Sequence, residues 1–139
     1  MASVTIVDEV VVVVPREALL HLLVDRTRWA LWWPGSEAIL VGEATGERLA
    51  WTLTGALVGF TSVTVSTHAD GVLVQYALDA DPAEPGSRSR PRPLGQSPHG
   101  RREARELRQR HQMAWRRTVW SLAAEYDEVM RSRGPGSGS

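Results

Sequence analysis

Four histidines are the side chains that could carry acid–base chemistry near neutral pH. His111 lies in a long helical segment, one turn before Trp115, on the face that helical spacing predicts to point inward. There it could donate a hydrogen bond to a ligand carbonyl or act as a general base, and Tyr76 is a second candidate for such a role. His111 could equally be a core or rim histidine with satisfied hydrogen bonds, so the catalytic residues stay unassigned.

The other histidines do not suggest a metal site. His21 is expected on the exposed side of a short helix, His68 at the end of a hairpin and His99 in a loop. No two histidines stand four residues apart on a helix, and the chain has no cysteine, which excludes disulfides, thiol catalysis and cysteine-based zinc sites. We therefore expect no metal and no other cofactor.

A second possible chemistry is the binding of an apolar molecule by aromatic and aliphatic side chains. The residues expected to line such a site occupy predicted inward positions or the corner before the first hairpin: Trp33, Trp51, Phe60, Tyr76, His111, Trp115, Val119 and Leu122. The alternative is that these side chains only fill a closed core, because protein interiors are densely packed.

A predicted antiparallel meander positions the strand residues of this set. Strands are expected at residues 4–14, 37–43, 48–54, 57–67 and 72–80, with breaks at residues 44–46, 55–56 and 69–71. Alternation in the third and fifth strands predicts that Trp51 and Tyr76 lie on the apolar faces of those strands. The first strand has valines on both faces, which suggests that both are covered.

Two helices complete the predicted fold. The segment after Pro15 is apolar around most of its circumference and should form a short, largely buried helix. Residues 101–131 contain no proline or glycine and predict a long helix with an inward stripe. The members of that stripe are His111, Trp115, Val119, Leu122, Tyr126 and Val129. Met113 and Trp120 fall on the opposite side, where Trp120 suggests a homodimer contact or a peripheral membrane contact.

The chain is expected to be one domain over residues 1–133, with a flexible loop rich in proline and arginine at residues 82–100 and a disordered tail at residues 134–139. Residues 1–81 hold ten acidic and four arginine residues, a net charge of −6, and residues 82–139 hold six and twelve, a net charge of +6. Nucleic-acid binding is nevertheless not expected, because no nucleic-acid-binding motif accompanies the arginines. No apolar run is long enough to cross a bilayer, and we predict a cytoplasmic protein.

Three of the six tryptophans (Trp29, Trp32 and Trp33) stand within five residues and are followed by Pro34 and Gly35. The segment VPREALLHLLVDRTRWALWWPG resembles the first helix and the following turn of the START-like, Bet v 1-like superfamily, also called SRPBCC or polyketide cyclase/dehydrase-like. The family pattern D-x-x-R-W-x-x-W-W-P-G is matched by Asp25, Arg28, Trp29, Trp32, Trp33, Pro34 and Gly35. The patterns W-x-x-x-G-x-x-x-G and D-G-x-x-x-x-Y look like a small actinobacterial branch, and are matched by Trp51, Gly55, Gly59, Asp70, Gly71 and Tyr76.

This resemblance implies an α+β helix-grip fold, in which a curved antiparallel sheet wraps around a long C-terminal helix, here with fewer strands than in larger members. It also implies an apolar cavity between sheet and helix, since relatives bind lipids, sterols or polyketides or cyclise aromatic polyketides. The leading expectation is a carrier or sensor of a small hydrophobic ligand. A cyclase-type enzyme is the alternative, so enzymatic activity is left open. A third possibility is an interaction protein with a filled core that acts through the outer face of its last helix.

Overall fold

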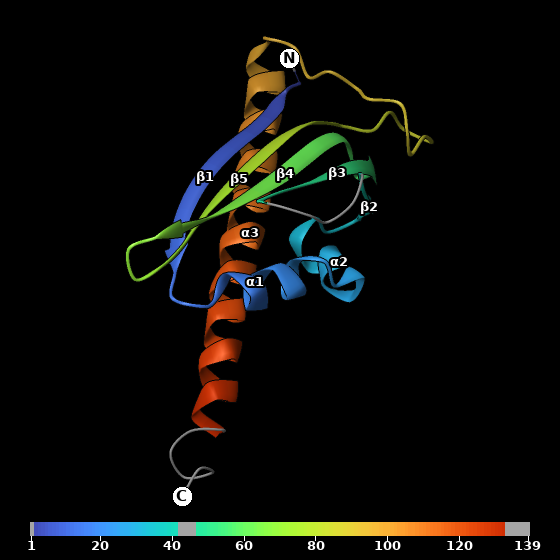
Figure 1. Cartoon of the computed structure of the whole chain (residues 1–139). Helices are drawn as coiled ribbons and strands as arrows, with labels where there is room; N and C mark the ends of the chain where they lie inside the picture. The colour runs from blue at the N-terminus through green and yellow to red at the C-terminus, as the bar shows by residue number, and fades with distance from the viewer. Residues whose placement is uncertain (1, 42–46, 133–139) are drawn as a thin grey trace, which may run out of the picture.

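The computed structural model describes residues 2–41 and 47–132. Five antiparallel strands form one sheet in the order β1-β5-β4-β3-β2, and a long helix, α3, crosses behind it (Figure 1). The elements are β1 (Val4–Val12), α1 (Arg16–Leu23), the 3-10 helix η1 (Arg26–Arg28), α2 (Trp29–Trp32), β2 (Ser36–Leu40), β3 (Arg48–Gly55), β4 (Leu57–His68), β5 (Gly71–Pro82) and α3 (Pro98–Ser132). This arrangement confirms the predicted α+β class and helix-grip layout.

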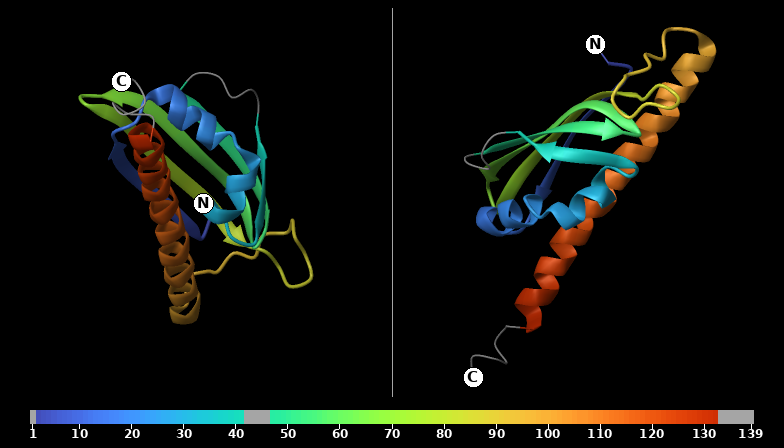
Figure 2. Two further views of the ribbon diagram at one scale, coloured as in Figure 1. Left: turned by 90° about the horizontal axis from the view of Figure 1, so that it is seen from below. Right: turned by 90° about the vertical axis from the view of Figure 1, so that its right-hand side faces the viewer.

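The helices cover one face of the sheet between them. α3 packs beside β1, while α1 contacts β4 and α2 contacts β2. All three lie on the same side of the curved sheet, and α3 continues beyond the sheet at its C-terminal end (Figure 2). Within residues 2–41 and 47–132, no helix lies on the other face of the sheet, so the core lies in the layer between strands and helices.

The predicted strand faces are confirmed on β3 and β5. Trp51 of β3 and Tyr76 of β5 point into the core and are fully buried, together with the alternate apolar residues on both strands. The expectation for β1 was wrong: only its inner side is covered, and Val7 on its outer side is 82% exposed. The valines on both faces of β1 therefore reflect the preference of β-branched residues for strands, not burial on both sides.

Two glycines of the resemblance patterns are required by close backbone approach. Gly55 has a φ of 102°, and Ala56 beside it donates its N–H to the carbonyl of Gly35 over 3.0 Å. A Cβ on Gly59 would collide with the backbone of Asp79 and Ala80 on the neighbouring strand. Gly55 is therefore required where the end of β3 approaches Gly35, and Gly59 where β4 approaches β5.

The hairpin predicted at residues 69–71 is confirmed, since His68 pairs with Gly71 across a turn that contains Ala69 with a φ of 40°. The predicted break at residues 44–46 and the tail at residues 134–139 lie outside the described residues. α1 is less buried than predicted, because only Leu19 and Leu23 of its apolar residues are buried.

The proline-rich segment differs from the expectation of a loop that buries too little to order itself. Leu94 is buried, and its N–H donates to the Ser3 hydroxyl over 2.8 Å. The Arg92 N–H donates to the carbonyl of Pro82 over 2.7 Å, and the Arg92 side chain pairs with Glu103. α3 begins at Pro98, inside the predicted loop, because Ser97 accepts a hydrogen bond from the Gly100 N–H as an N-cap. The flexibility expected of this segment is not tested by these contacts and stays a prediction.

Candidate functional site

Six aromatic side chains from both layers meet in the core. We call them the aromatic cluster: Trp29, Trp32, Trp33, Trp51, Tyr76 and Trp115. Three come from α2 and the residue after it, two from the sheet and one from α3. The cluster occupies the space between sheet and helix in which the resemblance to the START-like superfamily implied a cavity.

A stacked pair and a hydrogen bond define one side of the cluster. The rings of Tyr76 and Trp115 lie 4.2 Å apart, centroid to centroid, with 9° between their planes. Trp33 donates its Nε1–H to the Tyr76 hydroxyl over 3.0 Å. The sheet, α3 and the tryptophan corner are thus joined through one tyrosine.

Trp32 stands at the centre of the remaining contacts. Its ring lies 5.6 Å from Trp33, 5.8 Å from Trp115 and 6.3 Å from Trp51, at interplanar angles of 79° to 85°. Edge-to-face packing of this kind is the favoured geometry for aromatic pairs and stabilises a core beyond the area it buries. The cluster is therefore a well-packed unit, and its rings are held from several sides.

Four buried nitrogen atoms in this region have no hydrogen-bond partner: Nε1 of Trp32, Trp51 and Trp115, and Nδ1 of His111. The other two tryptophans of the cluster differ, since Trp29 donates to the Leu23 carbonyl over 2.9 Å and Trp33 donates to Tyr76. Leaving a buried polar group unpaired costs about 1–3 kcal/mol. Contacts of an N–H with an aromatic face offset only part of that cost.

Both candidate catalytic groups are buried: Tyr76 belongs to the cluster, and His111 lies one turn before Trp115 on α3. Burial raises the pKa of Tyr76 to about 12, against the opposing effect of its hydrogen bond with Trp33. Burial, and secondarily the nearby charge of Arg110, lowers the pKa of His111. Both groups are therefore neutral at neutral pH. His111 could accept a proton there, but its Nδ1 has no hydrogen-bond partner, so no carboxylate orients the ring through that nitrogen.

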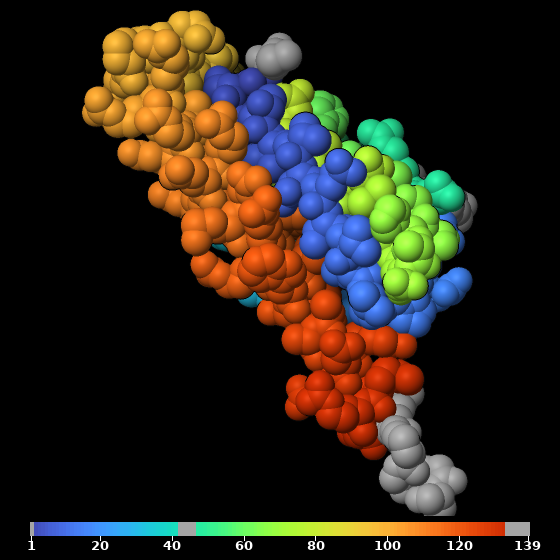
Figure 3. All heavy atoms as spheres, turned by 90° about the vertical axis from the view of Figure 1, so that its left-hand side faces the viewer, coloured from blue at the N-terminus to red at the C-terminus, as the bar shows by residue number. Residues whose placement is uncertain are grey.

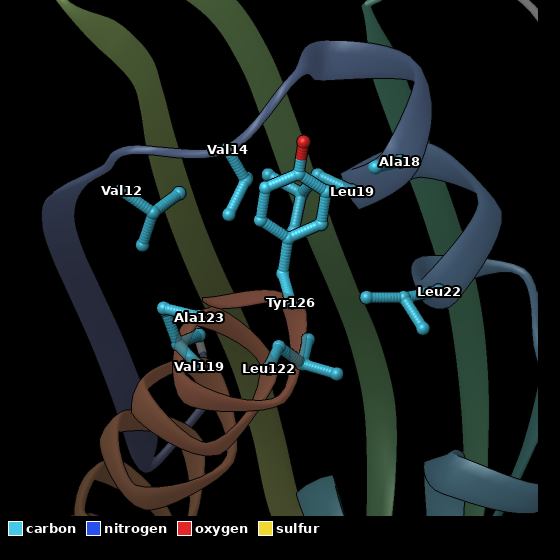
Figure 4. A pocket seen from close by; sticks show the side chains of 9 residues that line it. All are labelled: Val12, Val14, Ala18, Leu19, Leu22, Val119, Leu122, Ala123 and Tyr126. Atoms are coloured by element: carbon cyan, nitrogen blue, oxygen red, sulfur yellow. The ribbon is translucent and has the colours of Figure 1, made fainter. Parts of the chain in front are cut away.

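An apolar crevice leads toward the core between α1 and α3 (Figure 4). Nine residues line it: Val12, Val14, Ala18, Leu19, Leu22, Val119, Leu122, Ala123 and Tyr126. Its volume is about 10 Å³, which is room for one water molecule. The ring of Tyr126 rises from α3 into the middle of the crevice, with its oxygen pointing away from the helix (Figure 4).

The tryptophan corner is anchored by charged groups. Asp25 accepts hydrogen bonds from the N–H and the hydroxyl of Thr27 over 3.0 and 2.7 Å. Arg28 forms a bidentate ion pair with Glu125 of α3, with N–O distances of 2.8 and 3.0 Å. Its Nε also lies 3.4 Å from Oδ2 of Asp25. The corner that supplies three of the six rings is therefore tied directly to α3.

The sequence did not predict one ion pair between β1 and α3. Arg116 donates from Nε and Nη2 to the two carboxylate oxygens of Asp8 over 2.9 and 3.1 Å. The hydrogen bonds from Arg116 hold the pKa of Asp8 below its ordinary value of 3.8. The signal was present, because an acid at position 8 interrupts the inward apolar residues of β1 and requires a partner.

The structure brings seven of the eight predicted site residues together. Trp33, Trp51, Tyr76 and Trp115 belong to the aromatic cluster; Val119 and Leu122 line the crevice; His111 is buried one turn before Trp115. Phe60 was assigned wrongly. It lies on the outer face of β4 and is 65% exposed, because its neighbours Gly59 and Thr61 take the inward positions.

In the part of the chain that the structure describes, the other charged and titratable groups suggest no second centre. His21, His68 and His99 are exposed. Among residues 2–41 and 47–132, no group of three or more His, Asp or Glu side chains is placed to hold a metal ion. In that same part of the chain, no helix combines the length and hydropathy needed to cross a bilayer.

Comparison with known proteins gives a likeness in fold. No family model and no curated protein sequence matches the chain. The crystal structure of protein CV1439 from Chromobacterium violaceum, a structural-genomics target, is similar with a TM-score of 0.54 and 15% sequence identity. The match covers 86% of this chain and 95% of that protein. At this identity the comparison shows a shared fold.

Proposed function

We propose that the protein binds a small apolar molecule between its sheet and α3, as a carrier or sensor. The observation that carries this proposal is the group of four unpaired nitrogen atoms around the aromatic cluster. Buried donors in native proteins nearly always have a partner, and an exception calls for one that is missing. A ligand with acceptor oxygens would supply such partners.

The geometry favours a particular class of ligand. The free N–H groups belong to flat rings that pack edge to face, so a flat aromatic body could take the place of one of them. Several acceptor oxygens on one molecule would match several donors, which fits a polyketide-like compound better than a simple alkyl chain. The resemblance of the corner to the START-like superfamily, whose members bind lipids, sterols and polyketides, supports the same class.

Entry of such a ligand requires movement, because the crevice holds only about 10 Å³. α1 is the element suited to move. It has eight residues, of which Leu19 and Leu23 alone are buried, and it forms one wall of the crevice. A short helix held by few buried side chains opens at low cost compared with a packed core.

The experiment is a fluorescence titration with a dihydroxyanthraquinone, a flat probe with carbonyl and hydroxyl oxygens. We expect the wild-type chain to bind the probe, and Trp51→Phe to bind it about tenfold more weakly, because that change keeps a ring but removes a free donor. Trp120→Phe is the matched control, since Trp120 is 63% exposed and outside the cluster. Equal affinity in all three proteins, or none in the wild type, would refute the proposal.

A cyclase-type reaction at the same place is the alternative, and it depends on His111 as a base. Turnover of a poly-keto substrate that is lost in His111→Ala while the probe still binds would establish it. The unpaired Nδ1 favours the carrier over the enzyme, because a general base needs a group that orients it.

The third possibility, an interaction protein that acts through the outer face of α3, is favoured by a different observation. Trp120 exposes most of its indole on an arginine-rich helix, and tryptophan and arginine are enriched in interfaces. This function does not exclude ligand binding, since the two would use opposite sides of α3.

A further inference from the structure

Six residues of α3 form a seam along the flank of the helix that lies next to β1. They are Met113, Arg116, Trp120, Ala123, Asp127 and Met130, and their spacing of three and four residues is that of a coiled-coil seam. Met113, Trp120 and Met130 are among the exposed large apolar side chains of the protein. We use "the seam" for these six residues.

The seam lies in an open position. α3 runs alongside β1 on this side of the molecule, and its C-terminal turns continue past the body (Figure 3). A hollow of about 250 Å³ lies between Glu9 and Val10 of β1 and the side chains of Arg116 and Trp120. A second helix could therefore approach the seam without displacing any described element.

The C-terminal turns of α3 are largely exposed. From residue 124 to residue 132 every residue is exposed except Tyr126, which is half-buried. Helices gain most of their stability from packing an apolar face, and the described part of the chain leaves Met130 on this projecting end exposed.

The seam is complementary to itself in one orientation. When two copies run antiparallel with the axis between positions 120 and 123, Trp120 faces the small Ala123 of the second copy. Arg116 then faces Asp127 of the second copy, and Met113 faces Met130. A large side chain thus meets a small one, a cation meets an anion and an apolar residue meets an apolar residue.

A parallel arrangement would lack this match. It would place Arg116 against Arg116, Asp127 against Asp127 and the two Trp120 rings against each other, so like charges would oppose dimer formation. The distribution of charge along α3 also favours the antiparallel orientation. Residues 101–117 hold seven arginines and two glutamates, a net charge of +5, whereas residues 118–132 hold three acids and one arginine, a net charge of −2. In an antiparallel pair, the basic half of each helix lies beside the acidic half of the other.

We infer that the protein forms a homodimer through antiparallel pairing of α3 along the seam. Arg116 has two roles in this dimer, because it holds Asp8 within its own chain and faces Asp127 of the second copy. Trp115 of the aromatic cluster is not part of the seam, and Ala123 is the one residue that the seam shares with the lining of the crevice. The inferred dimer depends on the seam alone and not on the proposed ligand.

The first test is the mass of the full chain by sedimentation equilibrium. We expect twice the chain mass of 15.3 kDa, and a shift to monomer by about tenfold or more in the association constant for Trp120→Glu. Leu31→Glu is the matched control, because Leu31 is also 63% exposed but lies on α2, outside the seam. Far-UV circular dichroism of both variants checks that each remains folded.

The second test fixes the orientation and uses the absence of cysteine from the chain. Met113→Cys and Met130→Cys are prepared as separate proteins and oxidised. Antiparallel pairing predicts little cross-linking of either protein alone and strong cross-linking when the two are mixed. A monomer at concentrations up to about 100 μM would overturn the inference, as would a dimer insensitive to Trp120→Glu or cross-linking within each single variant.

Discussion

Tyr76 and Trp115 stack almost face to face, with their centroids 4.2 Å apart and 9° between their planes. This contact joins β5 to α3 at the centre of the core. Because the Tyr76 hydroxyl also accepts the Nε1–H of Trp33, the same side chain holds the tryptophan corner. One tyrosine therefore connects the three parts of the fold that surround the candidate site.

Tyr76→Phe should destabilise the protein although it preserves the stack. The change removes the acceptor of the Trp33 N–H and leaves a fully buried donor unpaired, which costs about 1–3 kcal/mol. Urea denaturation at pH 7 measures the free energy of unfolding. Tyr126→Phe is the control, since Tyr126 is half-buried in the crevice, and a change within about 0.5 kcal/mol is expected there. Equal losses in the two variants would contradict this account of Tyr76.

The ion pair of Asp8 and Arg116 should appear in the acid limb of the stability profile. The folded-state pKa of Asp8 is lowered from 3.8, chiefly by the hydrogen bonds from Arg116. The stabilisation is therefore complete above pH 3.8 and is lost as the pH falls through the lowered folded-state value.

Arg116→Met should lower the free energy of unfolding at pH 7, because it leaves the carboxylate of Asp8 without its partner. The loss should be smaller than for a fully buried pair, because the Arg116 side chain is half exposed. Arg117→Met, one residue further along α3 and exposed, should change stability little. An unchanged acid limb in Arg116→Met would show that the pair contributes nothing.

His111 should make the protein less stable in mildly acidic solution. Burial lowers its folded-state pKa below 6.5, so the unfolded chain takes up a proton first as the pH falls. The stabilisation is complete above pH 6.5 and is lost as the pH falls from there toward the lowered value. Urea denaturation at pH 7 and at pH 5 should therefore differ less for His111→Leu than for the wild type. His68→Leu, at an exposed position, should keep the wild-type difference.

Gly59→Ala should destabilise the fold far more than Gly86→Ala. A Cβ at position 59 would meet the backbone of Asp79 and Ala80, which cannot move without disturbing the pairing of β4 with β5. At Gly86 nothing lies within 4 Å, and only its φ of 80° opposes alanine, at about 1–2 kcal/mol. Thermal unfolding of the two variants compares the costs. A larger loss at position 86 would contradict the packing described for β4.

The fold could be predicted from the sequence because apolar residues recur with a clear period along its strands and along α3. Alternation on β3 and β5 placed Trp51 and Tyr76 on the inner face, and the helical stripe placed His111, Trp115 and Leu122 there as well. Phe60 was misplaced because an aromatic side chain was assumed to be inward, whereas the pairing of β4 leaves that position outside. Periodicity shows which residues share a face, but not which face is covered.

The site could be predicted only in part. The aromatic residues could be identified from their types. Their mutual packing could not, because it depends on contacts between the tryptophan corner and α3, which are far apart in sequence. The ion pair of Arg28 and Glu125 is one such contact. The pairing of Asp8 with Arg116 spans a similar separation. The N-terminus of α3 was missed although Ser97 followed by Pro98 is a typical helix start. The segment before it is rich in proline and arginine, and this composition led to the prediction of a loop up to residue 100.

The central claim is that the core accepts a small apolar ligand, and native mass spectrometry of the purified protein tests it most directly. The account predicts a bound species above the chain mass, which denaturing extraction releases as a flat, oxygen-bearing apolar compound. If none co-purifies, added dihydroxyanthraquinone should produce a one-to-one complex that Trp51→Phe weakens. A clean unliganded mass together with no complex at saturating probe would contradict the claim and would leave the outer side of α3 as the place where this protein acts.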